Sequence, residues 1–301
     1  MANVDPYDPP DLLSETGCFA SLDPLEPTTG VIPYGIHAPL FSDGADKGRW
    51  MVVPDPATVA SNGELEFAPG SVLLKHFSVD GRAVETRVMI RAAGNWAFHT
   101  YVWDGSDAER VLEGQTVDIG FDWEVPTAEA CQFCHGAAAR VLGPELGQLD
   151  VEVCYGGEPP QSQVAALRDW GLLSLGDIAV SSLVDPKDPT ESLEDRARSY
   201  LHVNCGSCHR PGGWTPPNMT MDLRFETPMS ETRLCGVPVQ FMGDIANTEM
   251  RIDPGNPWES HLYIRMNGGG LGKMPPFGAH IDPDGLALIG AWIHSMDGCP
   301  D

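Results

Sequence analysis

Two copies of the pattern Cys-x-x-Cys-His are the residues of this sequence best suited to chemistry: CQFCH at 131–135 and CGSCH at 205–209. Three chemistries use a pair of cysteines at this spacing. A redox-active dithiol opens a helix in a thioredoxin-like β-α-β setting. A structural zinc site needs two pairs that converge on one ion, commonly across a short spacer. Covalent attachment of haem uses the histidine as well as the cysteines.

The histidine directly behind each cysteine pair favours covalent haem. Two thiols at this spacing can form thioether bonds to the vinyl groups of a haem, and the adjacent imidazole then reaches the iron as an axial ligand. No β-α-β unit is visible around either motif, and a long stretch of chain separates the two pairs. The sequence therefore predicts two haem c groups, held by Cys131, Cys134, Cys205 and Cys208 and ligated by His135 and His209.

The second axial ligand of the second haem is predicted to be Met274. This methionine precedes two prolines in a Gly- and Pro-rich loop, directly before an amphipathic segment near the C-terminus. Prolines restrict the backbone and stiffen such a loop, and a following helix can pack it against a haem. Ligation by His and Met raises the reduction potential relative to ligation by two histidines.

The second axial ligand of the first haem is harder to assign, because no methionine lies between the two motifs. We favour His76, in the strand-like run LLKHFSV, which would let a β domain cap this haem. His99, His202 and a distant methionine such as Met242 are alternatives. A five-coordinate iron is a further alternative, and it would leave one position open for a substrate.

The stretch from about 50 to 125 has the pattern of an antiparallel sheet that could present such a histidine. The dipeptides DG at 80–81 and GN at 94–95 lie between runs rich in β-branched and aromatic residues, which is a strong hairpin signal. In the run between them, apolar residues and threonine alternate with charged residues that include Glu85 and Arg87. A period of two indicates a half-buried strand.

Helical patterns follow this stretch and lead into each motif. Thr127 is placed to cap a helix over the first motif, and either Thr190 or Ser192 can cap the helix that runs into the second. The run QSQVAALRDWGLL suggests another helix between them. In the final amphipathic segment Asp282 is a candidate N-cap, and Pro283 occupies the first helical position.

These patterns predict an α+β fold, with an antiparallel β-rich N-terminal domain followed by a mainly α-helical, cytochrome c-like di-haem region. The expected divisions are an irregular Pro/Gly-rich arm over 1–45, a β-rich domain over 46–125, a first haem c module over 126–189 and a second over 190–301.

The second module resembles the class I c-type cytochrome fold, in which Cys-x-x-Cys-His is followed by a ligating methionine and a C-terminal helix. CGSCHRPGGW and KMPPFG followed by GLALIGAWI match that order. More widely, PLFSDGADKGRW, ETRVMIR, YVW, NCGSCHRPGG and MPPFG resemble a family of exported bacterial di-haem c-type cytochromes. The resemblance covers most of the chain from about residue 10 onward, and it implies a β-rich part that precedes two haem motifs.

The charge of the chain limits its partners. It has 18 basic and 43 acidic residues, a formal net charge of −25. Nucleic acid and anionic membrane surfaces would repel such a protein, so we expect redox proteins as partners. The acidic residues form either a solvated surface or a face that docks a basic redox protein. No run approaches the roughly 18 apolar residues that span a bilayer, so no transmembrane segment is expected.

The four cysteines outside the motifs suit an oxidising compartment. Cys18, Cys154, Cys235 and Cys299 can form one or two disulfides, and we favour Cys235 with Cys299 and Cys18 with Cys154, without excluding buried thiols. The start of the chain has the composition of a mature N-terminus whose export signal has been removed. Haem c also implies assembly after export, so a periplasmic or extracellular, cell-surface location is predicted.

Three functions fit these features. The first is one-electron transfer between redox partners by a di-haem c-type cytochrome. The second is a peroxidase-like di-haem oxidoreductase whose five-coordinate first haem binds substrate, so enzymatic activity stays open. The third is a haem subunit of a larger redox complex. The absence of a substrate-handling motif favours the electron carrier.

Overall fold

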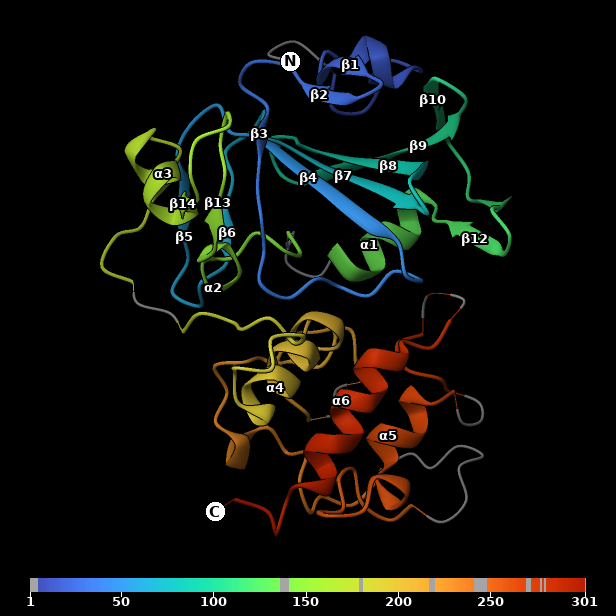
Figure 1. The fold of residues 1–301 in the computed structure, drawn as a ribbon, viewed down its shortest axis with the longest axis vertical. Helices are drawn as coiled ribbons and strands as arrows, with labels where there is room; N and C mark the ends of the chain where they lie inside the picture. The colour runs from blue at the N-terminus through green and yellow to red at the C-terminus, as the bar shows by residue number, and fades with distance from the viewer. Residues whose placement is uncertain are drawn as a thin grey trace. The chain divides into compact units, whose positions relative to one another are not determined.

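A computed structural model of the chain divides it into two compact units (Figure 1). The N-terminal unit contains Met1–Ile36 and Gly44–Val180, and the C-terminal unit contains His37–Asp43 and Ser181–Asp301. The structure describes residues 5–135, 141–178, 181–216, 220–240, 248–268, 272–276, 278 and 280–300.

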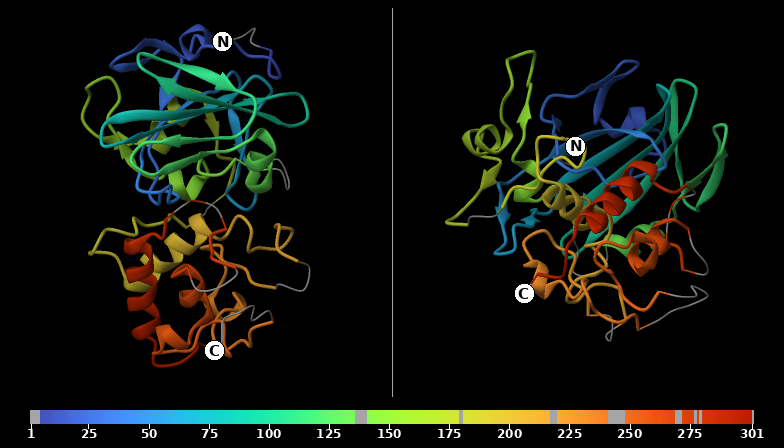
Figure 2. Two further views of the ribbon diagram at one scale, coloured as in Figure 1. Left: turned by 90° about the vertical axis from the view of Figure 1, so that its right-hand side faces the viewer. Right: turned by 60° about the horizontal axis from the view of Figure 1, so that its bottom comes forward.

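A six-stranded antiparallel sheet is the largest element of the N-terminal unit, and its strands lie side by side in Figure 2. The strand order is β10-β9-β8-β7-β4-β3, and each neighbouring pair is antiparallel. The predicted hairpins are confirmed, since Asp80-Gly81 joins β7 to β8 and Gly94-Asn95 joins β8 to β9. The strands are β3 (Ile32–Pro33), β4 (Asp46–Val52), β7 (Val72–Val79), β8 (Arg82–Arg91), β9 (Trp96–Asp104) and β10 (Asp107–Val111).

Short elements surround this sheet within the N-terminal unit. Strands β1 (Phe19–Leu22) and β2 (Leu25–Pro27) pair with each other, as do β11 (Gln115–Asp118) with β12 (Asp122–Val125) and β13 (Glu152–Val153) with β14 (Gln161–Ser162). Strand β5 (Ala57–Val59) pairs with β6 (Leu65–Glu66) and β15 (Leu173–Ser174). The helices are η1 (Leu13–Thr16), α1 (Ala128–His135), α2 (Leu146–Leu149) and α3 (Gln163–Asp169).

The two faces of the six-stranded sheet cover different cores. On one face, here called the arm face, Leu74, Val88 and Tyr101 pack against buried residues of the N-terminal segment such as Leu13. On the other, the helix face, Leu73 and its neighbours pack against α2 and α3 through buried leucines. Because successive side chains of a strand point to opposite faces, the position of a residue along its strand decides which core it joins.

The C-terminal unit is built on three α-helices among its described residues, namely α4 (Leu193–Asn204), α5 (His261–Met266) and α6 (Pro283–His294). Two 3₁₀ turns, η2 (Met229–Glu231) and η3 (Pro257–Glu259), lie between them. Helix α6 packs on α4, and Gly285 permits the close approach because a Cβ there would lie 2.2 Å from the Tyr200 ring. The core contains Leu201, Ile252 and Ile289, all at most 2% exposed.

Local signals placed the helix starts correctly. Ser192 Oγ accepts a hydrogen bond from Asp195 N at 3.0 Å at the start of α4, which selects Ser192 over Thr190 as the cap. Asp282 Oδ1 accepts one from Gly285 N, also at 3.0 Å, with Pro283 in the first turn of α6. Such caps satisfy backbone donors that have no partner inside the helix.

The predicted fold class is wrong in its helical half. Strands account for 27% of the described residues and helices for 21%, so the described part of the chain is β-rich. Residues 126–189 carry short helices interrupted by β13, β14 and β15, and much of the described chain between α4 and α6 is irregular. The 27 prolines and 33 glycines of the chain explain this outcome, because they end helices even where apolar periodicity continues.

Candidate haem-attachment sites

Helix α1 carries the whole first motif. Thr127 Oγ1 accepts a hydrogen bond from Ala130 N at 3.0 Å and confirms the predicted cap. Cys131 and Cys134 are three residues apart in this helix, so both thiols emerge on the same side. His135 is the last residue of α1, one turn beyond Cys131. The helix therefore presents two thiols and an imidazole together.

The first motif lies on the helix face of the sheet. The His135 ring is 5.4 Å from the Phe98 ring of β9, measured between centroids. Burial raises the pKa of the Cys131 thiol, while the charges of Arg87 and Lys75 act in the opposite direction. A thiol with a raised pKa is a poor redox nucleophile, which disfavours the dithiol interpretation.

The second motif begins where α4 ends. Cys205 follows the helix directly, and its carbonyl accepts hydrogen bonds from Cys208 N at 3.1 Å and His209 N at 2.9 Å. A Cβ on Gly206 would lie 2.6 Å from the carbonyl oxygen of His202, so this turn requires glycine. Burial, followed by the Cys208 thiol, raises the pKa of Cys205 to about 12. Both thiols of this motif are thus held in a tight turn at the edge of the core.

The His209 imidazole has the properties of an iron ligand. Its Nδ1 is buried and has no hydrogen-bond partner among the described residues. Burial, reinforced by the charges of Arg251 and Arg265, lowers the pKa of His209 to about 4, so the ring is neutral at physiological pH. A buried ring nitrogen without a partner is costly, and a neutral imidazole is the form that binds iron. The site fits a haem ligated here.

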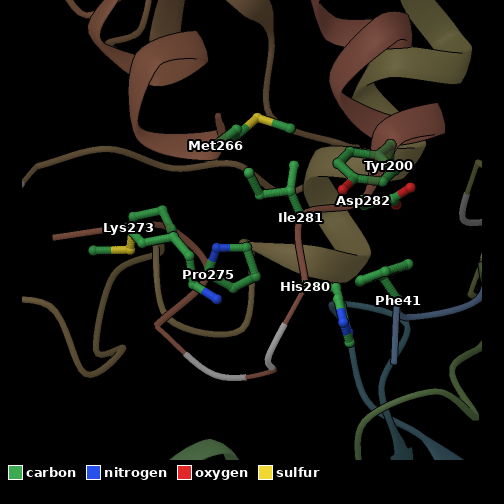
Figure 3. Close-up of a pocket in the computed structure, with 9 residues that line it drawn as sticks. Phe41, Tyr200, Met266, Lys273, Pro275, His280, Ile281 and Asp282 are labelled. Atoms are coloured by element: carbon green, nitrogen blue, oxygen red, sulfur yellow. The ribbon is translucent and has the colours of Figure 1, made fainter. Parts of the chain in front are cut away.

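Met274 lies in the same unit, beside the end of α5. Its backbone N donates a hydrogen bond to Arg265 O at 3.0 Å, and Arg265 also acts electrostatically on His209. Met274 lines a pocket with Met266 and His280, among other residues (Figure 3). Both predicted ligands of the second haem therefore interact with Arg265: Met274 through its backbone and His209 through the arginine charge.

His76, in contrast, is not brought to the first motif. It lies on β7 two residues after Leu74, on the arm face, where its Nδ1 is 2.9 Å from Thr86 Oγ1 and its ring stacks edge-on with Trp103. His135 lies on the helix face, so the sheet separates the two imidazoles. Burial lowers the pKa of His76 to about 4. A ligand role for His76 stays a prediction that this arrangement does not favour.

The alternative ligands are placed elsewhere. His99 Nε2 is 2.8 Å from Pro6 O in the N-terminal segment, and His202 Nδ1 accepts a hydrogen bond from Phe225 N at 2.9 Å in the C-terminal unit. Met242 lies outside the described residues. Of the described alternatives only His99 shares a compact unit with α1, and its ring contacts the N-terminal segment.

The sequence did not predict that charged residues would lie beside both motifs. Arg251 and Arg265 act on His209, while Lys75 and Arg87 act on Cys131. The alternation in β8 placed Arg87 and Glu85 on the polar face of a half-buried strand, and such a face is expected to be exposed. In the structure Glu85 is fully buried on that face. Only the position of α1 over the sheet shows that this polar face is interior.

The four cysteines outside the motifs differ in whether they form a disulfide. Cys235 and Cys299 form the predicted disulfide, but Cys18 and Cys154 do not form the second one, because Cys18 is buried and Cys154 is exposed. None of the four motif cysteines is disulfide-bonded. Within the described ranges no cluster of three or more His, Cys, Asp or Glu side chains could hold a metal ion by itself.

Two further findings concern membrane-spanning helices and similarity to known proteins. Among the described residues, none of the helices has the length and apolar character needed to cross a membrane. Comparisons with models of protein families, with characterised proteins and with solved structures gave no match.

Proposed function

We propose that this chain is a di-haem c-type cytochrome that transfers single electrons between redox proteins in the periplasm or at the cell surface. The observation that carries the proposal is the state of the cysteines. The chain forms a disulfide between Cys235 and Cys299, whereas both Cys-x-x-Cys pairs keep their thiols beside an imidazole. Thiols held in this way suit thioether bonds to haem.

The surroundings of the second motif support the same function. His209 is neutral and buried, and Met274 is anchored to the end of α5 near the cation that acts on His209. Haem supplies a one-electron iron couple whose potential depends on axial ligands, burial and nearby charge. The residues of the chain would hold the group, exclude water and set that potential.

The resemblance to exported di-haem cytochromes supports the proposal independently, because it rests on motifs outside the cysteine pairs, such as PLFSDGADKGRW and MPPFG. The net charge of −25 fits a partner with a basic docking surface. The donor and acceptor would then be proteins, and encounter rates would fall as ionic strength rises.

The test is a haem count on the full chain after export through a haem c maturation system. We expect two haems per chain in a pyridine haemochrome assay and a denatured mass that is larger by two haem groups. A colourless protein, or one with a single haem, would contradict the proposal.

A second candidate, a di-haem oxidoreductase, is favoured by one observation. Within the N-terminal unit, His76 and His99 both make contacts away from α1, which favours a first iron with an open position. Electron paramagnetic resonance of the oxidised protein distinguishes the two functions. A high-spin signal that changes on addition of peroxide would support the oxidoreductase, while two low-spin haems would support the electron carrier.

A further inference from the structure

Three cations stand directly opposite one another across three neighbouring strands of the N-terminal unit. Arg49 of β4 pairs in register with Lys75 of β7, and Lys75 pairs with Arg87 of β8. We call these three residues the cation row. Like charges in directly opposite cross-strand positions destabilise a sheet, so the row needs compensation by negative charge.

The cation row lies on the helix face, next to the first haem motif. Lys75 and Arg87 both act electrostatically on Cys131, and Arg87 also acts on Cys134. The chain has only 18 basic residues against 43 acidic ones. Three of these few cations therefore gather beside the two half-buried cysteines of the first motif, although the protein as a whole is acidic.

Protein carboxylates compensate the row only in part. Glu85 is fully buried and holds Arg87 through two contacts, of which Arg87 Nη2 to Glu85 Oε2 measures 3.0 Å. Glu85 also accepts a hydrogen bond from Trp123 Nε1 at 2.8 Å. Within the part of the chain that the structure describes, no carboxylate forms an ion pair with Lys75 or Arg49.

Lys75 is half-buried between the two guanidinium-bearing residues of the row. An added anion would be stabilising at this position, since partly desolvated like charges are costly unless they are paired.

We propose that Arg49, Lys75 and Arg87 form a carboxylate-binding row that holds the propionates of the haem attached at Cys131 and Cys134. This inference rests on the proposed function. A haem carries two carboxylates, and guanidinium groups bind carboxylates through paired hydrogen bonds, while an ammonium group adds a compact charge. A free oxyanion has the same chemistry, and the experiment below separates the two sources.

The row should also raise the reduction potential of the first haem, whatever its axial ligands are. A positive charge near a haem stabilises the reduced state relative to the oxidised state, which carries one more positive charge. Loss of a cation from the row should therefore lower the reduction potential of the first haem and leave the second haem unchanged.

The test is redox titration of the exported full chain with Lys75→Gln, with Arg82→Gln as the control. Lys75 has no described ion pair to leave unsatisfied, unlike Arg87, and Arg82 is an exposed cation directly after the turn of the same hairpin. We expect Lys75→Gln to lower the ratio of reduced to oxidised first haem at a fixed potential about tenfold, about 59 mV. Arg82→Gln should change this ratio less than twofold. Lys75→Arg keeps the positive charge and should give the same ratio as the wild type.

Two results would overturn the inference. One is an equal effect of Lys75→Gln and Arg82→Gln on the first haem. The other is a change of the first-haem potential when inorganic phosphate is added to the wild type but not to the Lys75→Gln variant, because the row would then bind a free oxyanion. The denatured mass of the wild type tests the proposed function separately from the cation row. If the first haem is missing from that mass, the proposed function itself is wrong.

Discussion

The same pentapeptide occurs in two different surroundings in this protein. The first copy ends a short helix that lies on a β-sheet, beside a row of cations and a fully buried Glu85. The second copy follows α4 in a small core of helices and irregular chain, and Met274 is hydrogen-bonded to Arg265, whose charge acts on His209. A motif can thus specify how a cofactor is attached, while the fold around it sets the ligands and charges that determine how the cofactor behaves.

The comparison predicts a division of properties between the two sites. The C-terminal unit brings a neutral histidine and a methionine to one region, as expected for a high-potential electron-transfer haem. The N-terminal unit supplies cations at α1 but places His76 on the other sheet face. The four predictions that follow test this division in order of decreasing effect.

The largest expected effect is the loss of one haem at a time. The double variant Cys131→Ala/Cys134→Ala should lose the haem of the N-terminal unit, and Cys205→Ala/Cys208→Ala should lose that of the C-terminal unit. Each denatured mass should fall by one haem beyond the change in side chains. The band assigned to methionine ligation should survive in the first variant and disappear in the second. Loss of both haems from either variant would show that the two sites do not assemble separately.

Truncation of a core side chain should destabilise either unit by a similar free energy, but each truncation should disturb a different haem. Ile289 of α6 and Leu74 of β7 are at most 1% exposed, and replacement of either by alanine leaves a cavity that costs about 2–5 kcal/mol. Ile289→Ala should lower the thermal midpoint for loss of methionine ligation at the second haem. Leu74→Ala should change the absorption of the first haem on heating before that of the second. The reverse assignment would contradict the division.

Replacement of Met274 should change the second haem alone. Met274→Ala removes the proposed thioether ligand, so the potential of the second haem should fall by at least about 59 mV, a tenfold change in its redox equilibrium. Met266→Leu is the matched control, because Met266 is a buried methionine of the same pocket. A normal methionine band in Met274→Ala would exclude Met274 as the ligand.

The smallest effects are expected at the helix caps. Ser192→Ala and Asp282→Ala each remove one hydrogen bond to a backbone N–H, at a cost of about 1 kcal/mol in unfolding free energy. Ser192 caps the helix that leads into the second motif, so its replacement should lower the stability of the second site in denaturant titration. Thr190→Ala is the control, since Thr190 does not cap α4 in the structure. Equal losses from Ser192→Ala and Thr190→Ala would contradict this assignment.

Local sequence signals predicted much of the secondary structure correctly. The DG dipeptide at 80–81 and the GN dipeptide at 94–95 do join neighbouring strands, and Thr127, Ser192 and Asp282 do cap helices. These signals succeed because turn and cap preferences depend on a few adjacent residues. The fold class was wrong because helix periodicity does not show how much irregular chain will connect the helices.

The sequence by itself determined the two Cys-x-x-Cys-His motifs, the hairpins and the helix starts, since each depends on residues close together in the chain. Tertiary structure decided which sheet face α1 covers, and therefore that Glu85 is buried and the cation row lies beside the first motif while His76 faces the other core. Strand alternation assigns residues to two faces, but it cannot say what packs on each. That outcome depends on contacts between segments far apart in the chain.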